Sequence, residues 1–149
     1  MEITDFLTAD RVILDVRSRD KTQLIGEIAR TMARLVPALT QATIGTALLA
    51  REQLGSTGLG AGFALPHARI EKLNTYLGLF ARLAKPLDFE AIDGKPVRLI
   101  FVLLIPAETT TPHVAALAAI SRRFREPGLG AKLMKADSEA TAYGLLTDR

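Results

Sequence analysis

The sequence predicts a single α/β domain that spans residues 1–149. Its length and its 48% hydrophobic content suit one domain with a core of its own. Apolar segments with the two-residue period of a strand alternate along the chain with segments at helical spacing, which favours the α/β class. No internal repeat, linker or low-complexity segment divides the chain, so a second domain is not expected.

The first strand and the first helix follow from the periodicity near the N-terminus. Residues 11–16 alternate and predict a strand, which places on one face Val12, Leu14 and Val16. Ser18 or Asp20 can cap the helix that follows, because a short polar side chain accepts a hydrogen bond from the first turn. Apolar residues recur at helical spacing up to residue 35, and Pro37 closes the helix.

A second helix leads into a glycine-rich segment. Thr40 can cap this helix and Gly55 ends it. Its inward-facing residues are expected to be Ile44, Ala47, Leu48 and Leu54. Residues 55–62 contain four glycines, which predicts a loop that turns sharply or approaches another group closely. Residues 63–65 form a short apolar run, which is extended because Pro66 excludes helical geometry from the residue before it.

Two further strands are predicted in the second half of the chain. Residues 76–83 predict a strand, residues 86–93 are irregular, and Asp93-Gly94 predicts a hairpin-type turn. Residues 99–105 are almost wholly apolar and end at Pro106. Such a run is typical of a central strand that is covered on both faces.

Three helices are predicted after this apolar strand. The first begins with Thr111 as the N-cap and Pro112 as the first helical residue, and it runs to about residue 125. Two short helices are expected over residues 128–135 and 138–146, the second capped by Ser138.

The composition excludes several classes of site and partner. The chain has no cysteine, so it forms neither a disulfide nor a cysteine-based metal site. Its net charge of +3 comes from 19 basic and 16 acidic residues that are interspersed, and the cluster of Arg122, Arg123 and Arg125 is interpreted as a solvated helix face. Because few aromatic residues are available to stack on bases, nucleic acid is not an expected partner.

No membrane-spanning or targeting segment is predicted. No apolar run reaches the roughly 20 residues that cross a bilayer. The first ten residues include three acidic ones and lack the basic and then apolar plan of a signal peptide. A soluble, cytoplasmic protein that is not embedded in a membrane is therefore expected.

The chain has only two histidines, and each lies where a strand is expected to end. His67 follows residues 63–65, and His113 follows the strand over residues 99–105. Ligands of open α/β sheets gather at the carboxyl ends of the strands, so the two rings converge if these strands are parallel neighbours. Taken singly, His67 can be a core or surface residue, and His113 can be an exposed residue of a first helical turn. The N-terminus of a helix favours the neutral form of a histidine ring and also attracts phosphate, so a histidine there, such as His113, lies close to a bound phosphate group.

Arg51 is a third candidate, because it lies late in the second helix, directly before the glycine-rich segment. A guanidinium can hold a phosphoryl group through several donors, although an arginine near a helix C-terminus can equally complement the helix dipole.

Other site motifs do not fit the chain. The glycine pattern lacks the lysine that ends a nucleotide P-loop and lacks the G-x-G-x-x-G spacing. Ser56 and Thr57 lack the context of a hydrolase nucleophile. No short-spaced ligand pair predicts a metal site, and no cofactor is expected.

Residues 51–67, REQLGSTGLGAGFALPH, resemble the motif R-E-x-x-x-S-T-G-I-G-x-G-x-A-[IV]-P-H. This motif belongs to the mannitol/fructose-type IIA components of the bacterial phosphoenolpyruvate-dependent phosphotransferase system (PTS). Residues 96–117 are similar to the family's apolar strand, loop and second histidine, so the resemblance covers essentially the whole chain. Residues 86–97 and the lack of a fused domain make the chain most similar to the nitrogen-regulatory IIA proteins. Ala68 departs from the glycine usual in the family, and its methyl group narrows the approach to His67.

The resemblance implies a mixed sheet of about five strands with helices on both faces, and it implies a phosphohistidine carrier. His67 would accept a phosphoryl group from the carrier protein HPr or its nitrogen-branch relative. Arg51 would neutralise the phosphoryl oxygens, and His113 would stabilise the group by a hydrogen bond or beside the helix N-terminus. Further phosphate contacts are expected from Ser56, Thr57, Gly58, Gly60 and Gly62. Phosphoryl transfer needs mainly positioning and charge stabilisation, so the scheme requires no metal.

Three functions remain open at this point. The first is a regulatory phosphocarrier, because a phosphate adds about −1.5 to −2 charges and can switch binding to target proteins. The second is a sugar-transport IIA subunit that passes the phosphoryl group to a IIB domain. The third is a non-catalytic module that senses an anion, against which the retained Arg51, His67 and His113 count. Leu59 and Phe63 could contribute to a docking surface or to the core.

Overall fold

A mixed β-sheet between two layers of helices forms the structure, which a computed structural model describes for residues 1–108 and 113–148. The described strands are β1 (Val12–Val16), β2 (Gly58–Gly60), β3 (Phe63–Ala64), β4 (His67–Ile70), β5 (Leu77–Leu87) and β6 (Val97–Pro106). The described helices are α1 (Lys21–Leu35), α2 (Gln41–Gln53), α3 (Val114–Phe124), α4 (Leu129–Lys135) and α5 (Glu139–Thr147), with 3-10 turns η1 (Ile3–Asp5) and η2 (Ala9–Arg11). The predicted α/β class is confirmed, although the described chain forms six strands where about five were expected.

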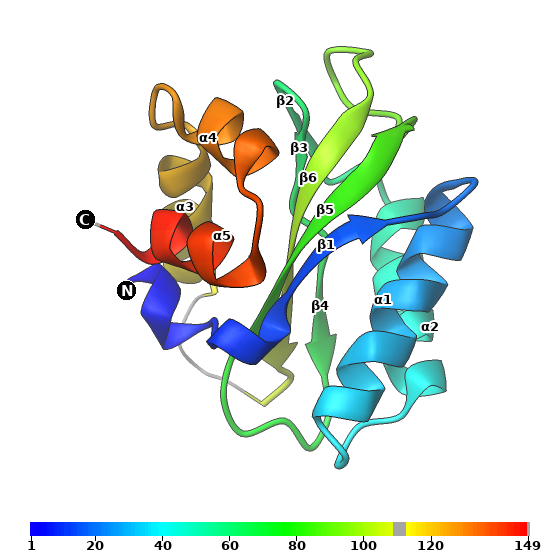
Figure 1. The fold of residues 1–149 in the computed structure, drawn as a ribbon. Coiled ribbons are helices and arrows are strands. Elements are labelled where there is room, and N and C mark those ends of the chain that lie inside the picture. The colour runs from blue at the N-terminus through cyan, green and yellow to red at the C-terminus, as the bar shows by residue number, and fades with distance from the viewer. Residues whose placement is uncertain (109–112, 149) are drawn as a thin grey trace.

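The sheet has both parallel and antiparallel neighbours. Its strand order is β1-β5-β6-β3-β2, with β4 also beside β6. Strands β3 and β4 run parallel to β6, β1 runs parallel to β5, and the remaining pairs are antiparallel. Helices α1 and α2 lie on one side of the sheet, and α3, α4 and α5 lie on the other (Figure 1).

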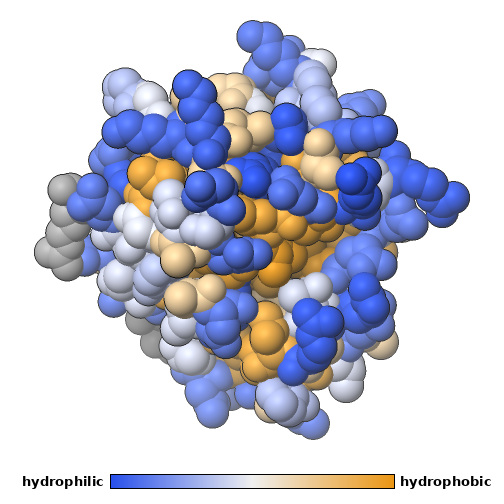
Figure 2. All heavy atoms as spheres, viewed as in Figure 1, coloured by the Kyte–Doolittle hydropathy of each residue, from blue (hydrophilic) through white to orange (hydrophobic). Residues whose placement is uncertain are grey.

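The central strand β6 contributes side chains to two separate cores, as the apolar run predicted. Toward α1 and α2 it buries Ile100, Val102 and Leu104. Toward η1 and α3–α5 it buries Leu99, Phe101, Leu103 and Ile105. Successive side chains of a strand point to opposite faces, so a strand covered on both sides must be apolar throughout. Figure 2 shows apolar side chains at the centre of one face of the molecule, with hydrophilic residues around them.

Proline divides one parallel strand into β3 and β4. Ala64 pairs with Ile100 and His67 pairs with Leu103, so both strands advance by three residues and the register is kept. Pro66 has no amide hydrogen, but its carbonyl oxygen accepts a hydrogen bond from the Leu103 amide at 2.9 Å. From the sequence we expected His67 to lie just beyond the end of a strand. The structure instead places His67 at the first position of β4.

The expected helix caps are present where the structure describes them. Asp20, and not Ser18, caps α1 by accepting from the Gln23 amide at 2.8 Å. Thr40 caps α2 and Ser138 caps α5 in the same way. The expected cap at Thr111 and the helix start at Pro112 lie outside the described residues, and His113 stands directly before the first turn of α3. No helix within the described ranges is both long enough and apolar enough to cross a membrane.

Four local expectations were wrong. Val16 does not share a face with Val12 and Leu14, because a bulge at Asp15 (φ 58°) moves Val16 to the other core. Leu54 is 85% exposed, since it lies at the C-cap of α2. The glycine-rich segment contains a short strand, β2, and β5 continues past residue 83 because its pairing with β6 resumes at Leu87.

Candidate functional site

A hollow of about 650 Å³ lies where α2, β4 and the beginning of α3 meet. Its lining residues are Ala47, Ala50, Arg51, Gln53, Leu54, His67, Ala68, Arg69, Ile105 and His113. The structure thus brings together His67, His113 and Arg51, the three side chains to which the sequence assigned phosphoryl chemistry. The parallel pairing of β4 with the end of β6 is what places the two histidines at the same edge of the sheet.

His67 is half-buried and has one defined ring contact. Its Nδ1 lies 2.8 Å from the carbonyl oxygen of Leu65, two residues earlier, across the turn made by Pro66. A carbonyl oxygen can only accept, so Nδ1 carries the proton and Nε2 keeps its lone pair. The neutral ring is therefore a nucleophile at Nε2.

Burial is the main reason that the pKa of His67 lies below its ordinary value of 6.5. The hydrogen bond to Leu65 acts in the opposite direction and raises this pKa. The electrostatic influence of Arg51 and of the neighbouring His113 lowers it further, whereas the carboxylate of Glu52 raises it. The ring is consequently held in the neutral form that can attack an electrophile.

Arg51 lines the hollow from the last turn of α2. Its Nη1 donates to the carbonyl oxygen of Gly55 at 2.8 Å, which ties the helix end to the start of the glycine-rich segment. The remaining guanidinium donors have no hydrogen-bond partner within the described part of the chain. The position of Arg51 is thus compatible with both roles considered from the sequence, which are holding a phosphoryl group and complementing the helix dipole.

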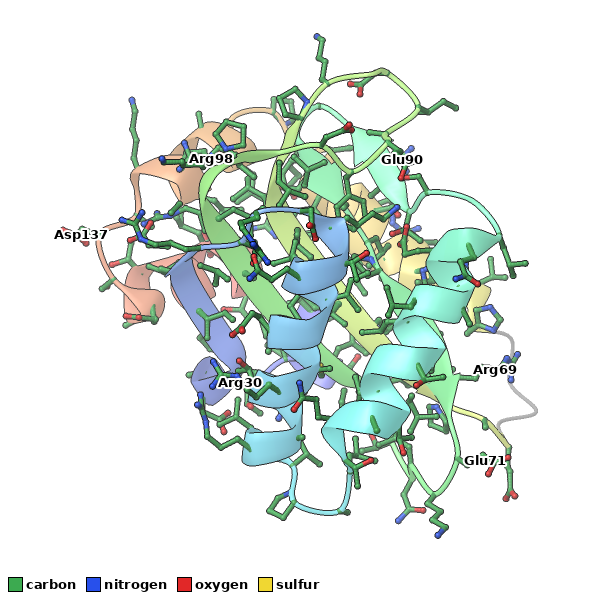
Figure 3. All side chains as sticks on the ribbon, turned by 90° about the vertical axis from the view of Figure 1, so that its right-hand side faces the viewer. Arg30, Arg69, Glu71, Glu90, Arg98 and Asp137 are labelled. Carbon is green, nitrogen blue, oxygen red and sulfur yellow. The ribbon has the colours of Figure 1, made fainter. Side chains whose placement is uncertain are left out.

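Arg69 is a residue of the hollow that the sequence analysis missed. Its Nη2 lies 3.0 Å from Nδ1 of His113, and its Nη1 donates to the carbonyl oxygen of Ala107 at 3.3 Å. Figure 3 shows Arg69 at β4, on the far side of α2 from α1. A strand prediction over residues 67–70 would have found it, because alternate residues of a strand share a face and Arg69 follows His67 by two.

The hydroxyl groups and the first amides of the glycine-rich segment make hydrogen bonds inside the protein. Ser56 Oγ donates to the carbonyl oxygen of Phe89 at 2.6 Å and accepts from the Gly58 amide at 3.0 Å. The Thr57 amide and hydroxyl both donate to the carboxylate of Glu52. The residues expected to contact phosphate, Ser56, Thr57, Gly58, Gly60 and Gly62, are not among those that line the hollow. Their role in phosphate binding stays a prediction that this geometry does not support.

A buried ion pair, also missed from the sequence, holds this segment against the two helices. Lys21 Nζ lies 2.6 Å from Glu52 Oε2, and the Glu52 side chain is only 5% exposed. The ammonium also donates to the Phe89 carbonyl oxygen and lies 4.5 Å from the centre of the Phe89 ring. Arg51 and Glu52 thus have different tasks, since one lines the hollow and the other fixes the segment beside it.

The close approach predicted from the glycines is present at Gly58. A Cβ atom there would lie 2.6 Å from Cβ of Ala91, in the connection between β5 and β6. The same connection holds the segment at Asp93, whose carboxylate accepts from the amides of Ala61 and Lys95, each at 3.0 Å. These two hydrogen bonds lower the pKa of Asp93 below its ordinary value. The glycine-rich segment is therefore anchored to this connection.

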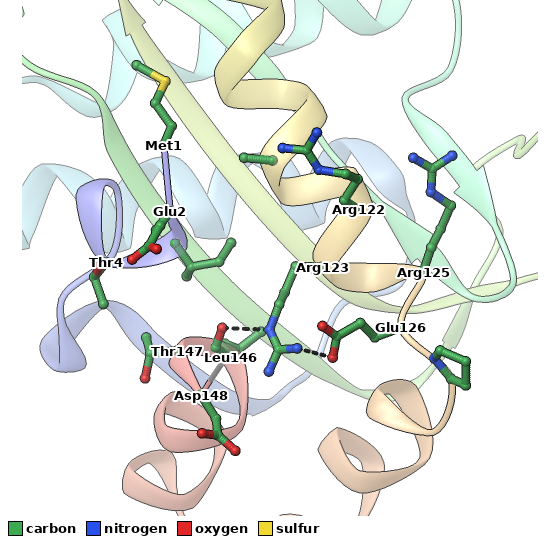
Figure 4. A pocket seen from close by; sticks show the side chains of 13 residues that line it. Met1, Glu2, Thr4, Arg122, Arg123, Arg125, Glu126, Leu146, Thr147 and Asp148 are labelled. Atoms are coloured by element: carbon green, nitrogen blue, oxygen red, sulfur yellow. Dashed lines mark hydrogen bonds and ion pairs between the residues drawn. The ribbon is translucent and has the colours of Figure 1, made fainter.

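A second hollow, of about 600 Å³, lies at the other end of α3 beside η1 and α5 (Figure 4). Arg122 and Arg125 are exposed there, as expected for a solvated helix face. Arg123 is not, because its side chain donates to the carbonyl oxygens of Leu145 and Leu146 at the end of α5 and pairs with Glu126.

Within the described ranges, histidine and acidic side chains nowhere gather in a group of three that could hold a metal ion.

The model of one protein family matches residues 5–149, and its description is "Phosphoenolpyruvate-dependent sugar phosphotransferase system, EIIA 2". The chain belongs to this EIIA family. It is therefore a phosphotransfer component of the PTS, with no helix in its described part that could span a membrane.

Several members of the EIIA family that are similar to this chain are nitrogen regulatory proteins. A nitrogen regulatory protein of Bradyrhizobium diazoefficiens is 37% identical over 146 residues, which are 98% of this chain and 95% of the relative. The crystal structure of the nitrogen regulatory protein IIA-Ntr from Neisseria meningitidis superposes with a TM-score of 0.90 at 36% identity, and covers 97% of this chain and 99% of its own. The mannitol IIA of Escherichia coli, in its complex with phosphorylated mannitol IIB, has a TM-score of 0.80. At 17% identity over 96% of this chain and 98% of its own, it shows a common fold.

Proposed function

We propose that this EIIA chain is a phosphohistidine carrier that accepts the phosphoryl group on Nε2 of His67. The observation that carries the proposal is the Nδ1 contact to the Leu65 carbonyl oxygen, which leaves the Nε2 lone pair free in a hollow shared with Arg51 and His113. The lowered pKa of His67 supports the same assignment, because only the neutral ring is a nucleophile.

The transfer balances without a separate acid or base. Nε2 of His67 attacks the phosphorus of an incoming phosphohistidine, and the N–P bond of the donor breaks as the new N–P bond forms. The donor ring, whose other nitrogen carries a proton, leaves as a neutral imidazole with the bonding electron pair. The His67 ring keeps its Nδ1 proton and takes up the positive charge that the donor ring loses, because Nε2 has no proton to lose. Arg51 neutralises the phosphoryl oxygens and His113 donates a hydrogen bond to them, which is the positioning and charge stabilisation that such a transfer needs.

The donor is HPr or its nitrogen-branch relative, which docks around the hollow. Leu54, which lines it, and Val114, next to His113, are 85% and 65% exposed and form an apolar rim for such a partner. Of the two residues considered for docking from the sequence, Leu59 is 44% exposed, but Phe63 is buried in the core. Phe63 therefore cannot form part of the rim.

The output of the carrier is regulatory, as the names of its similar relatives suggest. A phosphate on His67 would add about −1.5 to −2 charges beside Arg51 and Arg69. Target proteins that bind this surface would then distinguish the charged form of the carrier from the uncharged form.

The test is phosphorylation with purified components. The protein is incubated with phosphoenolpyruvate, enzyme I and HPr, and separately with the nitrogen-branch counterparts, and its intact mass is measured. We expect one acid-labile phosphate on the wild type and on His113→Ala at a reduced rate, and none on His67→Ala. A phosphate that persists without His67 overturns the assignment of the acceptor.

A sugar-transport IIA subunit is the second candidate, favoured by the common fold with the mannitol IIA that is bound to its IIB domain. Phosphorylated protein is mixed with a mannitol-type or fructose-type IIB domain, and transfer is followed by mass. Ready transfer would contradict a purely regulatory output. If neither donor set phosphorylates the folded protein, the anion-sensing module takes precedence.

A further inference from the structure

We infer that Arg69 is a positioning residue that fixes the tautomer of His113, opposite to that of His67. The inference rests on the proposed function and adds to it a residue that the phosphoryl chemistry itself does not require. Through this contact with Arg69, His113 becomes a hydrogen-bond donor toward the phosphoryl group.

The contact between the two side chains determines where the His113 proton lies. Nη2 of Arg69 is 3.0 Å from Nδ1 of His113. A guanidinium has five donors and no acceptor, so Nδ1 must be the acceptor. A neutral imidazole that accepts at Nδ1 carries its proton on Nε2. His113 therefore offers an Nε2–H group in the hollow that it lines together with His67.

The guanidinium is itself held in place by a second hydrogen bond. Nη1 of Arg69 donates to the carbonyl oxygen of Ala107 at 3.3 Å. Arg69 lies on β4 and pairs with Ile105 of β6. Its guanidinium therefore connects Ala107, the residue after β6, to His113, the residue before α3. Two donors in a fixed plane orient the imidazole ring as well as assigning its proton.

The two histidines thus become complementary. The Leu65 carbonyl oxygen accepts from Nδ1 of His67 and leaves a lone pair on Nε2, whereas the Arg69 guanidinium donates to Nδ1 of His113 and leaves a proton on Nε2. One ring can attack phosphorus and the other can donate to a phosphoryl oxygen. With the opposite tautomer, His113 would present a lone pair to the negatively charged oxygens and repel them.

Nitrogen NMR of the imidazole rings tests the inference on the protein without any phosphate. With ¹⁵N-labelled histidine at mildly alkaline pH, we expect the wild type to show the Nε2–H tautomer for His113 and the Nδ1–H tautomer for His67. In Arg69→Met we expect a mixture of tautomers at His113 and no change at His67. Arg122→Met, which removes an exposed arginine at the other end of α3, should change neither ring.

Arg69→Gln keeps a polar side chain at this position and serves if Arg69→Met fails to fold. A glutamine amide can accept as well as donate, so the His113 tautomer should again become mixed. An Nδ1–H tautomer at His113 in the wild type would overturn the inference without any variant. An unchanged His113 tautomer in folded Arg69→Met or Arg69→Gln would do the same.

The rate of phosphoryl acceptance links the tautomer to function. We expect acceptance by His67 to slow about tenfold in Arg69→Met, the size of effect that follows the loss of one neutral hydrogen bond to the transferred group. A mixed tautomer combined with an unchanged rate contradicts the positioning role. If the wild type accepts no phosphate, the proposed function fails, while the NMR spectra still decide whether Arg69 sets the tautomer.

Discussion

At the scale of single residues, the site depends on which atoms of two imidazole rings carry protons. The hydrogen-bond partner of each Nδ1 atom decides this, and the two partners differ: a carbonyl oxygen for His67 and a guanidinium for His113. Burial then lowers the pKa of His67 and keeps its ring neutral. The same ring type can therefore perform two different tasks within one hollow.

The pKa of His67 gives the first prediction. In an NMR titration its midpoint should lie below 6.5, and in Arg51→Met it should rise while staying below 6.5, because burial is the larger cause and remains. An unchanged midpoint in Arg51→Met would show that the guanidinium exerts no field at the ring.

The same shift makes the stability of the fold depend on pH. The folded protein disfavours the protonated ring, so this contribution is fully present above the unfolded pKa near 6.5 and is lost as the pH falls through the folded pKa. Urea unfolding of the wild type should show this loss, and His67→Ala should lack it. Equal pH profiles for the two proteins would contradict the lowered pKa.

The second prediction concerns Thr57, which was expected to bind phosphate and instead bonds to Glu52. Thr57→Val removes the hydroxyl donor from a buried carboxylate, so the free energy of unfolding should fall by about 1.5–3 kcal/mol. Thr46→Val, at an exposed position on the same helix as Glu52, should change it by at most about 0.5 kcal/mol. Equal urea midpoints for the two variants would mean that the Thr57 hydroxyl does not support Glu52.

At the scale of elements, two interruptions of regular structure shape the site. Pro66 divides the strand beside β6 and lets the chain turn so that the His67 ring contacts the Leu65 carbonyl oxygen. The glycines after α2 let β2 lie against the connection between β5 and β6. The interruption at Pro66 keeps the register with β6, so β4 continues the sheet next to the hollow.

Gly58 gives the third prediction. Gly58→Ala places a methyl group 2.8 Å from the backbone Cα of Ala91, so the β5–β6 connection must shift and the free energy of unfolding should fall by about 1–3 kcal/mol. Gly144→Ala, in the interior of α5 with no atom within 4 Å of the new Cβ, should instead raise it by up to about 1 kcal/mol. The two variants are compared by urea unfolding, and a Gly58→Ala protein as stable as the wild type would contradict the close approach.

At the scale of the whole molecule, the sheet separates two cores, and polar contacts join a helical layer to the sheet. The clearest joint is Arg82 on β5, which is 7% exposed and donates to the carbonyl oxygens of Leu133 and Ala136 at 2.9 and 2.6 Å. These groups end α4, so the arginine fastens the helical layer of α3–α5 to the sheet. Its partner Asp15 is largely exposed and contributes little.

Arg82 gives the fourth prediction. Arg82→Met removes the arginine donor from the Ala136 carbonyl oxygen and from the Leu133 carbonyl oxygen, which keeps only the Ala136 amide at 3.4 Å, so the free energy of unfolding should fall by roughly 2–4 kcal/mol. Arg30→Met, which removes an exposed ion pair with Glu27 on α1 (Figure 3), should change it by less than about 1 kcal/mol. Arg82 lies away from the hollow, so phosphoryl acceptance by folded Arg82→Met should remain near the wild-type rate. Loss of acceptance with intact structure would show that the two layers are coupled.

Much of the fold could be predicted from local patterns, because those patterns are short-range. The apolar run of β6 required cover on both faces, and Asp20, Thr40 and Ser138 marked helix starts that the structure confirms. Two of the errors arose where pairing with a distant strand overrides the local pattern. The bulge at Asp15 and the resumption of pairing at Leu87 are two examples, since neither has a signal in its own neighbourhood.

The sequence by itself determined the α/β class, the positions of most helices and the three side chains expected to carry phosphoryl chemistry. Only the tertiary structure brought Arg51, His67 and His113 to one hollow, because the parallel pairing of β4 with β6 joins residues far apart in the chain. Only the tertiary structure revealed Arg69 and turned Ser56 and Thr57 inward. A proton on a histidine ring is assigned by whichever group lies within hydrogen-bonding distance, and that neighbour exists only once the chain has folded.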